Sequence, residues 1–283
     1  MPLAHTGDLL REAAQIGTGL GAFNVVSLEH GEAIVEAAEQ AQLPAVLQVS
    51  ENCIRFHRGN LVPLVTGLGA LASTSSVRVS LHLDHIEDEE LLRQAAGTSV
   101  TSAMFDASKL PFEANVAASR AVGQWAHGQG WHVEAELGEV GGKDGAHAPG
   151  ARTDPFDAER FVAEAGVDSL AIAIGSSHAM TSRTAHLDHE LLARIHAAVP
   201  VPLVLHGSSG VPDEELRSAI AGGITKVNVG TIVNVAFTRA VRESLADPGL
   251  VDPRKYLAPA RGEVTALVRD MLELISIPKA AAL

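Results

Sequence analysis

The fold of this chain is read most directly from the stretch VRVSLHLDH, residues 77–85. It begins as an apolar, β-branched run, which is typical of a strand buried on both faces of a parallel sheet. It then ends in His82, Leu83, Asp84 and His85. In β/α barrels the side chains that carry chemistry collect at the carboxyl ends of the strands. The stretch therefore suggests a barrel strand with part of a site at its end, although a surface pair of histidines beside a loop aspartate explains this motif equally well.

Seven further short apolar runs resemble this one, and a helix-like pattern follows each of the eight. Alternating strands and helices in this number predict an α/β fold, a closed (β/α)8 TIM barrel, with a doubly wound open sheet as the competing architecture. The predicted strands are residues 21–25, 45–50, 77–83, 100–106, 132–137, 169–174, 203–205 and 225–229. The predicted helices are residues 29–40, 61–71, 88–96, 111–127, 157–165, 188–198, 212–221 and 231–245.

The 283 residues are expected to form a single domain over residues 1–283. A helix over residues 6–16, with Thr6 near its N-cap and Gly17 after its end, is expected to cover the bottom or side of the barrel. A helical extension is expected over residues 253–275. Residues 138–154 follow the fifth strand, are rich in Gly, Ala and Pro, and are predicted to form a mobile active-site loop.

The composition excludes several classes of partner. With 21 basic and 34 acidic residues the formal net charge is −13, which argues against nucleic acid or an anionic membrane as a partner. Any anionic substrate must then be held by local devices such as helix N-termini, backbone N–H groups or a metal ion. The single cysteine, Cys53, is expected to be a buried apolar side chain. The sequence shows no secretory or membrane-length apolar segment, so a cytoplasmic enzyme is expected.

Polar residues gather at the carboxyl ends of the predicted strands. Three of them, His85, His178 and His206, follow the third, sixth and seventh strands and can converge above the barrel mouth. Each histidine alone is more often structural, but three neutral imidazoles are the ligand set of catalytic zinc sites that leave a position open for substrate or water. The whole set is Asn24, Ser50, Asp84, His85, Asp106, Glu134, Glu136, His178, His206 and Asn228.

Two small-residue turns close the last two barrel strands. The segments HGSSG, residues 206–210, and NVGT, residues 228–231, each precede a predicted helix. The loops after strands seven and eight of β/α barrels often bind phosphate through backbone N–H groups and a helix N-terminus. Phosphate binding is therefore predicted here, with two ordinary tight turns as the alternative.

These motifs together resemble the class II, metal-dependent fructose-bisphosphate and tagatose-bisphosphate aldolases. The matching stretches keep the family's order over nearly the whole chain. They are AFNV (22–25), LQVSENCIRF (47–56), SLHLDH (80–85), VEAELGEVGG (133–142), GVDSLAIAIGSSH (166–178), PLVLHGSSGVP (202–212), TKVNVGT (225–231) and DPRKYLAPAR (252–261).

The resemblance implies a zinc-dependent aldolase that cleaves a ketose bisphosphate to dihydroxyacetone phosphate and an aldehyde through a metal-stabilised enediolate. It implies that Zn²⁺ is held by His85, His178 and His206 with Glu134 and Asp106 near it, and that Asp84 carries the proton. Glu136 and His82 are expected to support these residues. The implied phosphate- or substrate-binding residues are Asn24, Ser50, Gly207, Ser208, Ser209, Asn228, Gly230, Thr231 and Arg261, although a surface salt bridge is an equal alternative for Arg261.

The chain departs from the family in the fifth loop. It reads GGKDG over residues 141–145, so Asp144 would replace the family's loop glutamate, a side chain longer by one methylene. Arg152 stands where an aromatic residue is usual, and Ala179 where glycine is. The substrate stays open among fructose 1,6-bisphosphate, tagatose 1,6-bisphosphate and a phosphorylated deoxy-ketogluconate.

Two other classes of protein compete with this aldolase. They are a non-catalytic partner subunit of a tagatose-bisphosphate aldolase and a hydrolase using zinc-bound water. By resemblance, a homodimer or homotetramer acting on a small sugar phosphate is expected, and a monovalent cation (Na⁺ or K⁺) is a possible further requirement.

Overall fold

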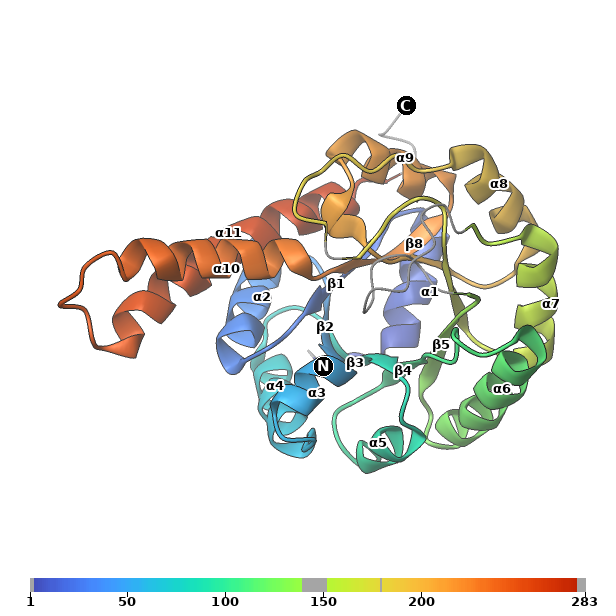
Figure 1. Ribbon diagram of the computed structural model, residues 1–283, viewed down its shortest axis with the longest axis horizontal. Helices are drawn as coiled ribbons and strands as arrows, with labels where there is room; N and C mark the ends of the chain where they lie inside the picture. Colours follow the sequence, from blue (N-terminus) through green and yellow to red (C-terminus); the bar gives the residue numbers. More distant parts are fainter. Residues whose placement is uncertain (1–2, 139–151, 179, 279–283) are drawn as a thin grey trace.

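The computed structural model describes residues 3–138, 152–178 and 180–278 (Figure 1). Its eight strands are parallel and pair in chain order, with β1 against β8, so that the sheet closes into a barrel. The predicted TIM barrel is confirmed and the open sheet is excluded. The strands are β1 (Leu20–Asn24), β2 (Ala45–Ser50), β3 (Val79–Ile86), β4 (Ser102–Phe105), β5 (His132–Glu136), β6 (Ser169–Ile172), β7 (Leu203–Leu205) and β8 (Ile224–Val229).

The alternation of side chains along each strand separates two environments. In β3 the apolar side chains of Val79, Leu81 and Leu83 join the main core between the sheet and the helices. The intervening Ser80 and His82 are also buried, but they face the inside of the barrel, where His82 meets residues of other strands. Because successive residues of a strand point to opposite faces, an apolar sheet can carry a polar interior.

Helices surround the barrel as an outer ring (Figure 1). They follow the expected segments closely, but two short elements were not predicted, α3 and the 3-10 turn η1 (Ser208–Gly210). The helices are α1 (Thr6–Ile16), α2 (Leu28–Ala41), α3 (Glu51–Phe56), α4 (Val62–Thr74), α5 (Glu89–Gln94), α6 (Phe112–Gly128), α7 (Pro155–Ala165), α8 (His189–Ala198), α9 (Asp213–Gly222), α10 (Thr231–Ser244) and α11 (Pro253–Ile275).

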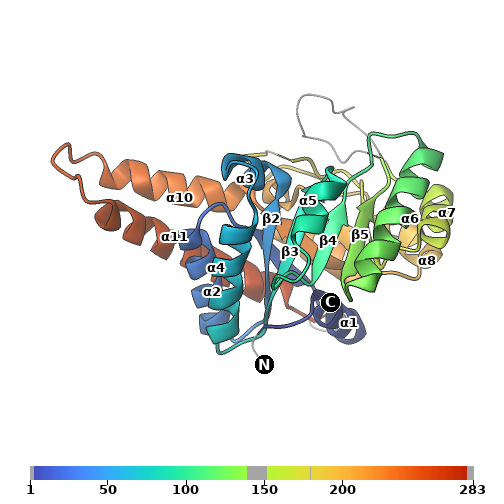
Figure 2. The same ribbon diagram turned by 90° about the horizontal axis from the view of Figure 1, so that it is seen from below.

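Helix α1 closes the barrel at the end where the strands begin (Figure 2). Its Leu9 and Leu10 pack against Leu20 and Val46 of the first two strands. The N-cap is His5, whose ring accepts a hydrogen bond from the Gly7 N–H at 3.2 Å, so the cap lies one residue before Thr6. With this end closed by a helix, the opposite end of the barrel is the one left open for a site.

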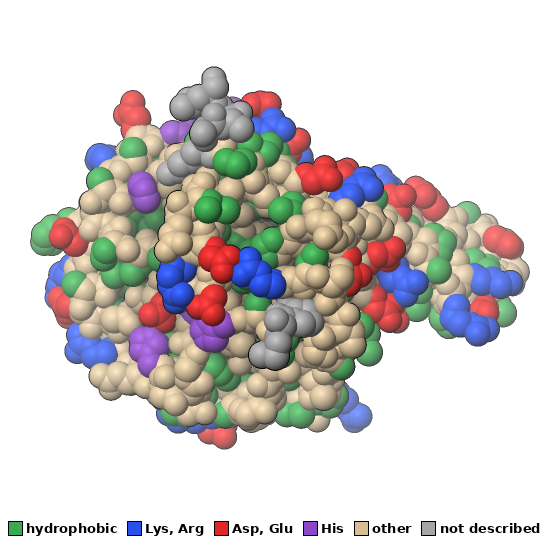
Figure 3. Space-filling model, turned by 180° about the vertical axis from the view of Figure 1, so that it is seen from behind, with side chains coloured by type: hydrophobic (Ala, Val, Ile, Leu, Met, Phe, Trp, Pro, Cys, Tyr) green, Lys and Arg blue, Asp and Glu red, His purple; other side chains and the backbone are tan. Residues whose placement is uncertain are grey.

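Helices α10 and α11 form an antiparallel pair that projects from one side of the barrel (Figures 1 and 2). We call this pair and its connection, residues 231–275, the arm. Seen from the face that carries α1, its surface bears charged side chains of both signs (Figure 3). The arm also exposes apolar side chains, among them Val235 and Val251. No helix in the described part of the chain is both long and apolar enough to span a membrane.

Candidate active site

Three histidines meet at the open end of the barrel. His85 lies near the end of β3, His178 follows β6, and His206 follows β7 directly. Their potential ligand atoms all lie within 4.8 Å of one another. The centroids of their rings are 4.6 to 5.7 Å apart and the ring planes are steeply inclined to each other, so the imidazoles surround a common point rather than stack.

The backbone at the end of β3 is bent to bring this cluster together. His85 has a φ of 49°, in the left-handed region, and the pairing of β3 with β4 shifts register between Leu83 and Ile86. Such bulges re-aim side chains beside active sites, and a left-handed residue other than glycine costs on the order of 1–3 kcal/mol. Asp84 shares the inward parity of His82, and the bend allows the next residue, His85, to face the barrel mouth as well.

His85 is oriented by Asp106, which follows β4. Its Nδ1–H donates to Asp106 Oδ2 at 2.8 Å, so the lone pair of the neutral ring lies on Nε2. This Nε2 is buried and has no hydrogen-bond partner among the residues that the structure describes. A carboxylate behind a histidine, with the other ring nitrogen left bare, is the usual arrangement around a metal.

His206 is oriented in the same way, by Glu134 of β5. Its Nε2 donates to Glu134 Oε1 at 3.0 Å, while its Nδ1 lies 3.4 Å from Glu136 Oε2. Burial lowers the pKa of His206, but the hydrogen bonds to Glu134 and Glu136 outweigh it and raise that pKa to about 9. A cation binding at Nδ1 must therefore displace a proton from this ring.

The two glutamates of β5 lie differently from what the sequence predicted. Glu136 was predicted to support the site, yet its carboxylate lies within 4.8 Å of the ligand atoms of His85 and Asp106. Glu134, predicted to lie at the metal, binds His206 through one oxygen and Lys226 through the other at 2.7 Å. Both point into the barrel, but Glu134 lies two residues deeper, beneath His206 rather than beside the cluster. In this geometry Glu136, rather than Glu134, lies beside the ligand atoms of His85 and Asp106, and which glutamate contacts a bound metal stays a prediction.

The donor set fits a divalent cation such as zinc. Three imidazoles with at least one carboxylate in reach match the N and O ligands that Zn²⁺ prefers. The fit rests on the buried bare Nε2 of His85 and on the carboxylates that hold the remote nitrogens of His85 and His206. His85, His178 and His206 would hold the ion.

Asp84 lies beside the cluster and is buried. Its Oδ1 accepts a hydrogen bond from Asn228 Nδ2 at 3.2 Å. Burial raises its pKa, but the nearby His85 and His206, followed by Lys226, outweigh burial and hold the pKa below its ordinary value. Asp84 is therefore an ionised carboxylate that can accept a proton.

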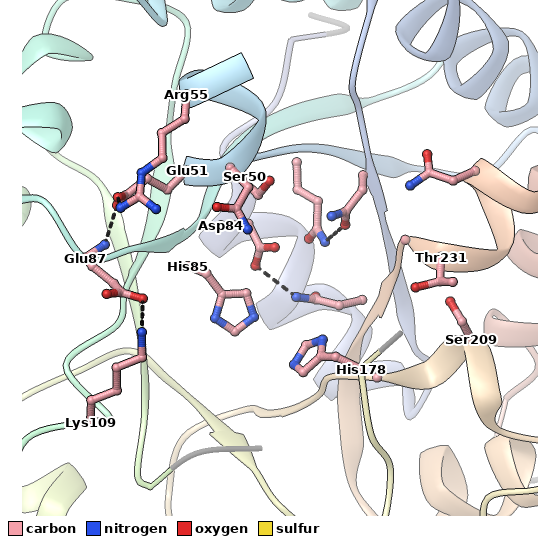
Figure 4. A pocket seen from close by; sticks show the side chains of 17 residues that line it. Ser50, Glu51, Arg55, Asp84, His85, Glu87, Lys109, His178, Ser209 and Thr231 are labelled. Carbon is pink, nitrogen blue, oxygen red and sulfur yellow. Dashed lines mark hydrogen bonds and ion pairs between the residues drawn. The ribbon is translucent and has the colours of Figure 1, made fainter. Parts of the chain in front are cut away.

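A single pocket joins these groups to most of the predicted substrate residues (Figure 4). Figure 4 shows Asp84, His85 and His178 in its middle, with Ser209 and Thr231 at one end and Arg55, Glu87 and Lys109 at the other. The predicted residues that line it are Asn24, Ser50, Asp84, His85, His178, Gly207, Ser209, Asn228, Gly230 and Thr231. Ser208 lies behind this lining, where its hydroxyl donates to the backbone oxygen of Asn228.

The end near Ser209 and Thr231 has the shape of an anion cradle. Gly207 has a φ of 67°, and a Cβ there would lie 2.6 Å from the carbonyl carbon of Ser177, so no other residue fits. The Ser209 hydroxyl accepts from the Ile232 N–H at 3.2 Å, which ties η1 to the first turn of α10. The N-terminus of α10 and the Gly207 turn thus face one pocket end, as phosphate sites do.

Two predicted residues lie elsewhere. Arg261 was expected near the substrate, but it lies on α11, pairs with Glu32 of α2 and is not among the described residues lining the pocket. The surface salt bridge, its alternative, is what the structure shows. Asp144, and most of the predicted loop over residues 138–154, lie outside the described residues.

The pocket rim opposite the cradle was missed by sequence reasoning. There Arg55 of α3 pairs with Glu51, and Lys109 Nζ lies 2.9 Å from Glu87 Oε1. Glu51 also accepts from the Glu87 N–H at 2.6 Å, which joins both pairs into one rim. Helix α3 has only six residues, too few for a periodic signal.

Cys53, also in α3, is buried as predicted, and burial raises the pKa of its thiol to about 11. At neutral pH the thiol is therefore protonated, and it is a poor nucleophile.

A barrel whose mouth can hold a divalent cation beside an ionised aspartate defines a class of metal-dependent enzymes. The family model described as class-II fructose-bisphosphate aldolase matches residues 4–278. The fructose-bisphosphate aldolase of Geobacillus stearothermophilus is 40% identical over 287 residues, covering 99% of this chain and 100% of that protein. The chain belongs to the class II fructose-bisphosphate aldolase family and is a metal-dependent aldolase, a carbon–carbon lyase.

Solved structures agree with this assignment. The YdjI aldolase from Escherichia coli K12 superposes with a TM-score of 0.84 at 31% identity, covering 98% of this chain and 99% of that one. A putative fructose-1,6-bisphosphate aldolase from Coccidioides immitis gives a TM-score of 0.85 at 31% identity, covering 95% and 94%.

Proposed function

We propose that the protein is a zinc-dependent aldolase that reversibly cleaves a ketose 1,6-bisphosphate to dihydroxyacetone phosphate and an aldehyde. The observation that carries the proposal is that one pocket is lined by the ionised Asp84, by two members of the three-histidine cluster and by the anion cradle. Fructose 1,6-bisphosphate and tagatose 1,6-bisphosphate are the candidate substrates. The relative from Geobacillus stearothermophilus, which is named a fructose-bisphosphate aldolase, supports the first.

Different groups in the pocket carry out different steps of the reaction. The metal, when bound, supplies a Lewis acid that polarises the ketone carbonyl. The cradle around Gly207 and Ser209 holds the phosphate of the ketone half, and Asp84 takes the proton of the C4 hydroxyl. The C3–C4 bond then breaks, its electron pair stays on C3 of the ketone half, and the aldehyde leaves. C3 then takes up a proton to give dihydroxyacetone phosphate, a transfer for which the family resemblance suggests Asp144. In the reverse direction Asp84 returns the proton to the aldehyde oxygen.

This function is tested by measuring dihydroxyacetone phosphate release after chelation, with and without added Zn²⁺. We expect no release from the chelated protein and restored cleavage of fructose or tagatose 1,6-bisphosphate after zinc is added. Cleavage of only the phosphorylated deoxy-ketogluconate would keep the aldolase and change its substrate. A zinc-loaded protein that cleaves none of the three would contradict the proposal and favour a partner role. Phosphate release without carbon–carbon cleavage would indicate a hydrolase.

The rim at the other pocket end supports a substrate with a second anionic group. Arg55 is cationic and lines the pocket opposite the cradle. Replacing Arg55 with methionine is expected to raise KM for the bisphosphate about 10-fold. A hydrogen bond to a charged group is worth roughly 1.5–3 kcal/mol, and the largely exposed Arg55 side chain puts the loss at the low end of that range. KM for the matching ketose 1-phosphate should not change.

Arg58→Met is the matched control for this prediction. Arg58 is exposed and lies three residues further along the chain, just after the end of α3 and outside the described pocket lining. Its replacement should leave both KM values unchanged. An equal rise in KM for both substrates in Arg55→Met would show that Arg55 does not bind the second phosphate of the bisphosphate.

The proposal also covers the oligomeric state of the protein, its location in the cell and its need for a monovalent cation. We propose a homodimer or homotetramer, supported by the projecting arm, whose exposed Val235 and Val251 a second copy could cover. Sedimentation of the purified protein would measure this. A cytoplasmic location and a requirement for Na⁺ or K⁺ stay predictions.

A further inference from the structure

A lysine lies fully buried inside the barrel. Lys226, in the middle of β8, has no exposed surface, and its Nζ lies 2.7 Å from Glu134 Oε2 and 3.3 Å from His82 Nε2. Burying an ammonium group is costly unless it is paired, and well-packed apolar residues would often be at least as stable as a buried ion pair. This charge therefore needs an explanation beyond packing.

Glu134 connects Lys226 to the histidine cluster. Lys226 occupies Oε2 of Glu134, and the other oxygen, Oε1, meets His206 Nε2 at 3.0 Å. A carboxylate paired with an ammonium group can only accept hydrogen bonds, so Nε2 of His206 must carry the hydrogen. The lone pair of the neutral ring is then on Nδ1, the nitrogen that faces the cluster.

The other neighbour of Lys226 fixes its position. His82 Nε2 accepts from Lys226, and His82 Nδ1 meets the hydroxyl of Ser102 at 2.8 Å. The ammonium group is thus held between a histidine of β3 and a glutamate of β5, across the inside of the barrel. Its position is set by three strands rather than by its own flexible side chain.

We propose that Lys226 is a positioning residue of the metal site: through Glu134 it orients His206 so that Nδ1 is presented to the metal. This inference rests on the proposed function, in which His85, His178 and His206 bind a divalent metal. Asn228, two residues along the same strand, binds Asp84 in turn. One strand therefore sets the orientation of a ligand and of the proton acceptor.

The test replaces Lys226 with methionine and measures metal affinity by competition with a chelator, for Zn²⁺ and for Co²⁺. Loss of a partner behind a metal ligand typically weakens binding about 10- to 100-fold, and we expect a loss of that size. The visible absorption spectrum of bound Co²⁺ should also change, because it reports ligand geometry, which a general loss of stability would not alter.

Ser169→Ala is the matched control. Ser169 of β6 is buried in the same barrel interior and contacts His132, and no hydrogen bond joins it to Lys226, His82 or Glu134 in the described part of the chain. Its replacement should lower the melting temperature while the Co²⁺ spectrum and the metal affinity stay within about twofold of wild type, well short of the losses typical of residues behind a metal ligand. An equal effect on metal binding in both variants would overturn the inference, because any disturbance of the interior would then suffice.

A double variant, Glu134→Gln with Lys226→Met, guards against failure of the single variant to fold. It removes both charges and leaves an amide oxygen that can accept from His206 Nε2. If Lys226 acts through Glu134, the double variant should bind metal no more weakly than Glu134→Gln alone. Independent, additive losses would overturn the inference. If wild-type protein itself fails to bind the metal, the proposed function fails and not this step alone.

Discussion

Replacing Asp84 with alanine is expected to lower kcat for carbon–carbon cleavage by on the order of 100- to 10,000-fold, the usual effect of losing a positioned proton acceptor. The reason is geometric and electrostatic, since Asp84 is buried, ionised and lies in the pocket beside His85. Metal content should stay near one ion per chain, because the three histidines do not depend on this carboxylate for their orientation. Steady-state kinetics together with metal analysis would measure both.

Asp188→Ala provides the control for Asp84. Asp188 is the N-cap of α8 and accepts from the Leu191 N–H at 2.9 Å, away from the described pocket lining. Its loss should cost about 1 kcal/mol of stability and leave kcat unchanged. If Asp84→Ala turned over as fast as this control, Asp84 would have no part in the reaction.

Replacing His206 with alanine is expected to remove the metal. His206 is fully buried, and it is the ligand whose orientation depends on Glu134. Losing one of three protein ligands should weaken binding beyond the roughly 100-fold that loss of an outer partner costs. The dialysed variant should therefore contain almost no zinc by elemental analysis and should not release dihydroxyacetone phosphate.

His132→Asn is the control for His206. His132 is also a buried histidine on a barrel strand, but it lies at the start of β5 and contacts Ser169 at 2.9 Å. Its replacement should lower stability and leave the metal in place. Full zinc occupancy in His206→Ala would remove His206 from the ligand set.

The barrel could be predicted because its signals are local. Each strand is a short apolar run, and in β3 the alternation of Leu81 and Leu83 with polar residues shows which side chains face the helices. A parallel barrel places the carboxyl ends of all its strands at one end. The convergence of His85, His178 and His206 therefore followed from their places in the chain, and the structure brings them within 4.8 Å.

Short or strained elements carried weaker signals. The six residues of α3 were too few to show a helical period, so Arg55 at the pocket rim was missed. The left-handed backbone at His85 was also hidden, because only the pairing of β3 with β4 imposes it. Lys226 could have been noticed in the sequence, because a lysine within an otherwise apolar, buried strand requires a polar or acidic partner inside the barrel.

The partners of the inward-facing side chains were decided by tertiary structure alone. Glu134 and Glu136 have the same parity in β5, so both face the barrel interior, with Glu134 two residues deeper. Their partners are not local: Lys226, 92 residues away, and His206, 72 residues away, meet Glu134 across the barrel. Arg261 likewise meets Glu32 over 229 residues through the packing of α11 on α2. Whether a segment forms a strand depends on the residues next to it in the sequence. Which side chains meet inside the barrel depends instead on how the strands are staggered and on how far each side chain reaches across the closed sheet.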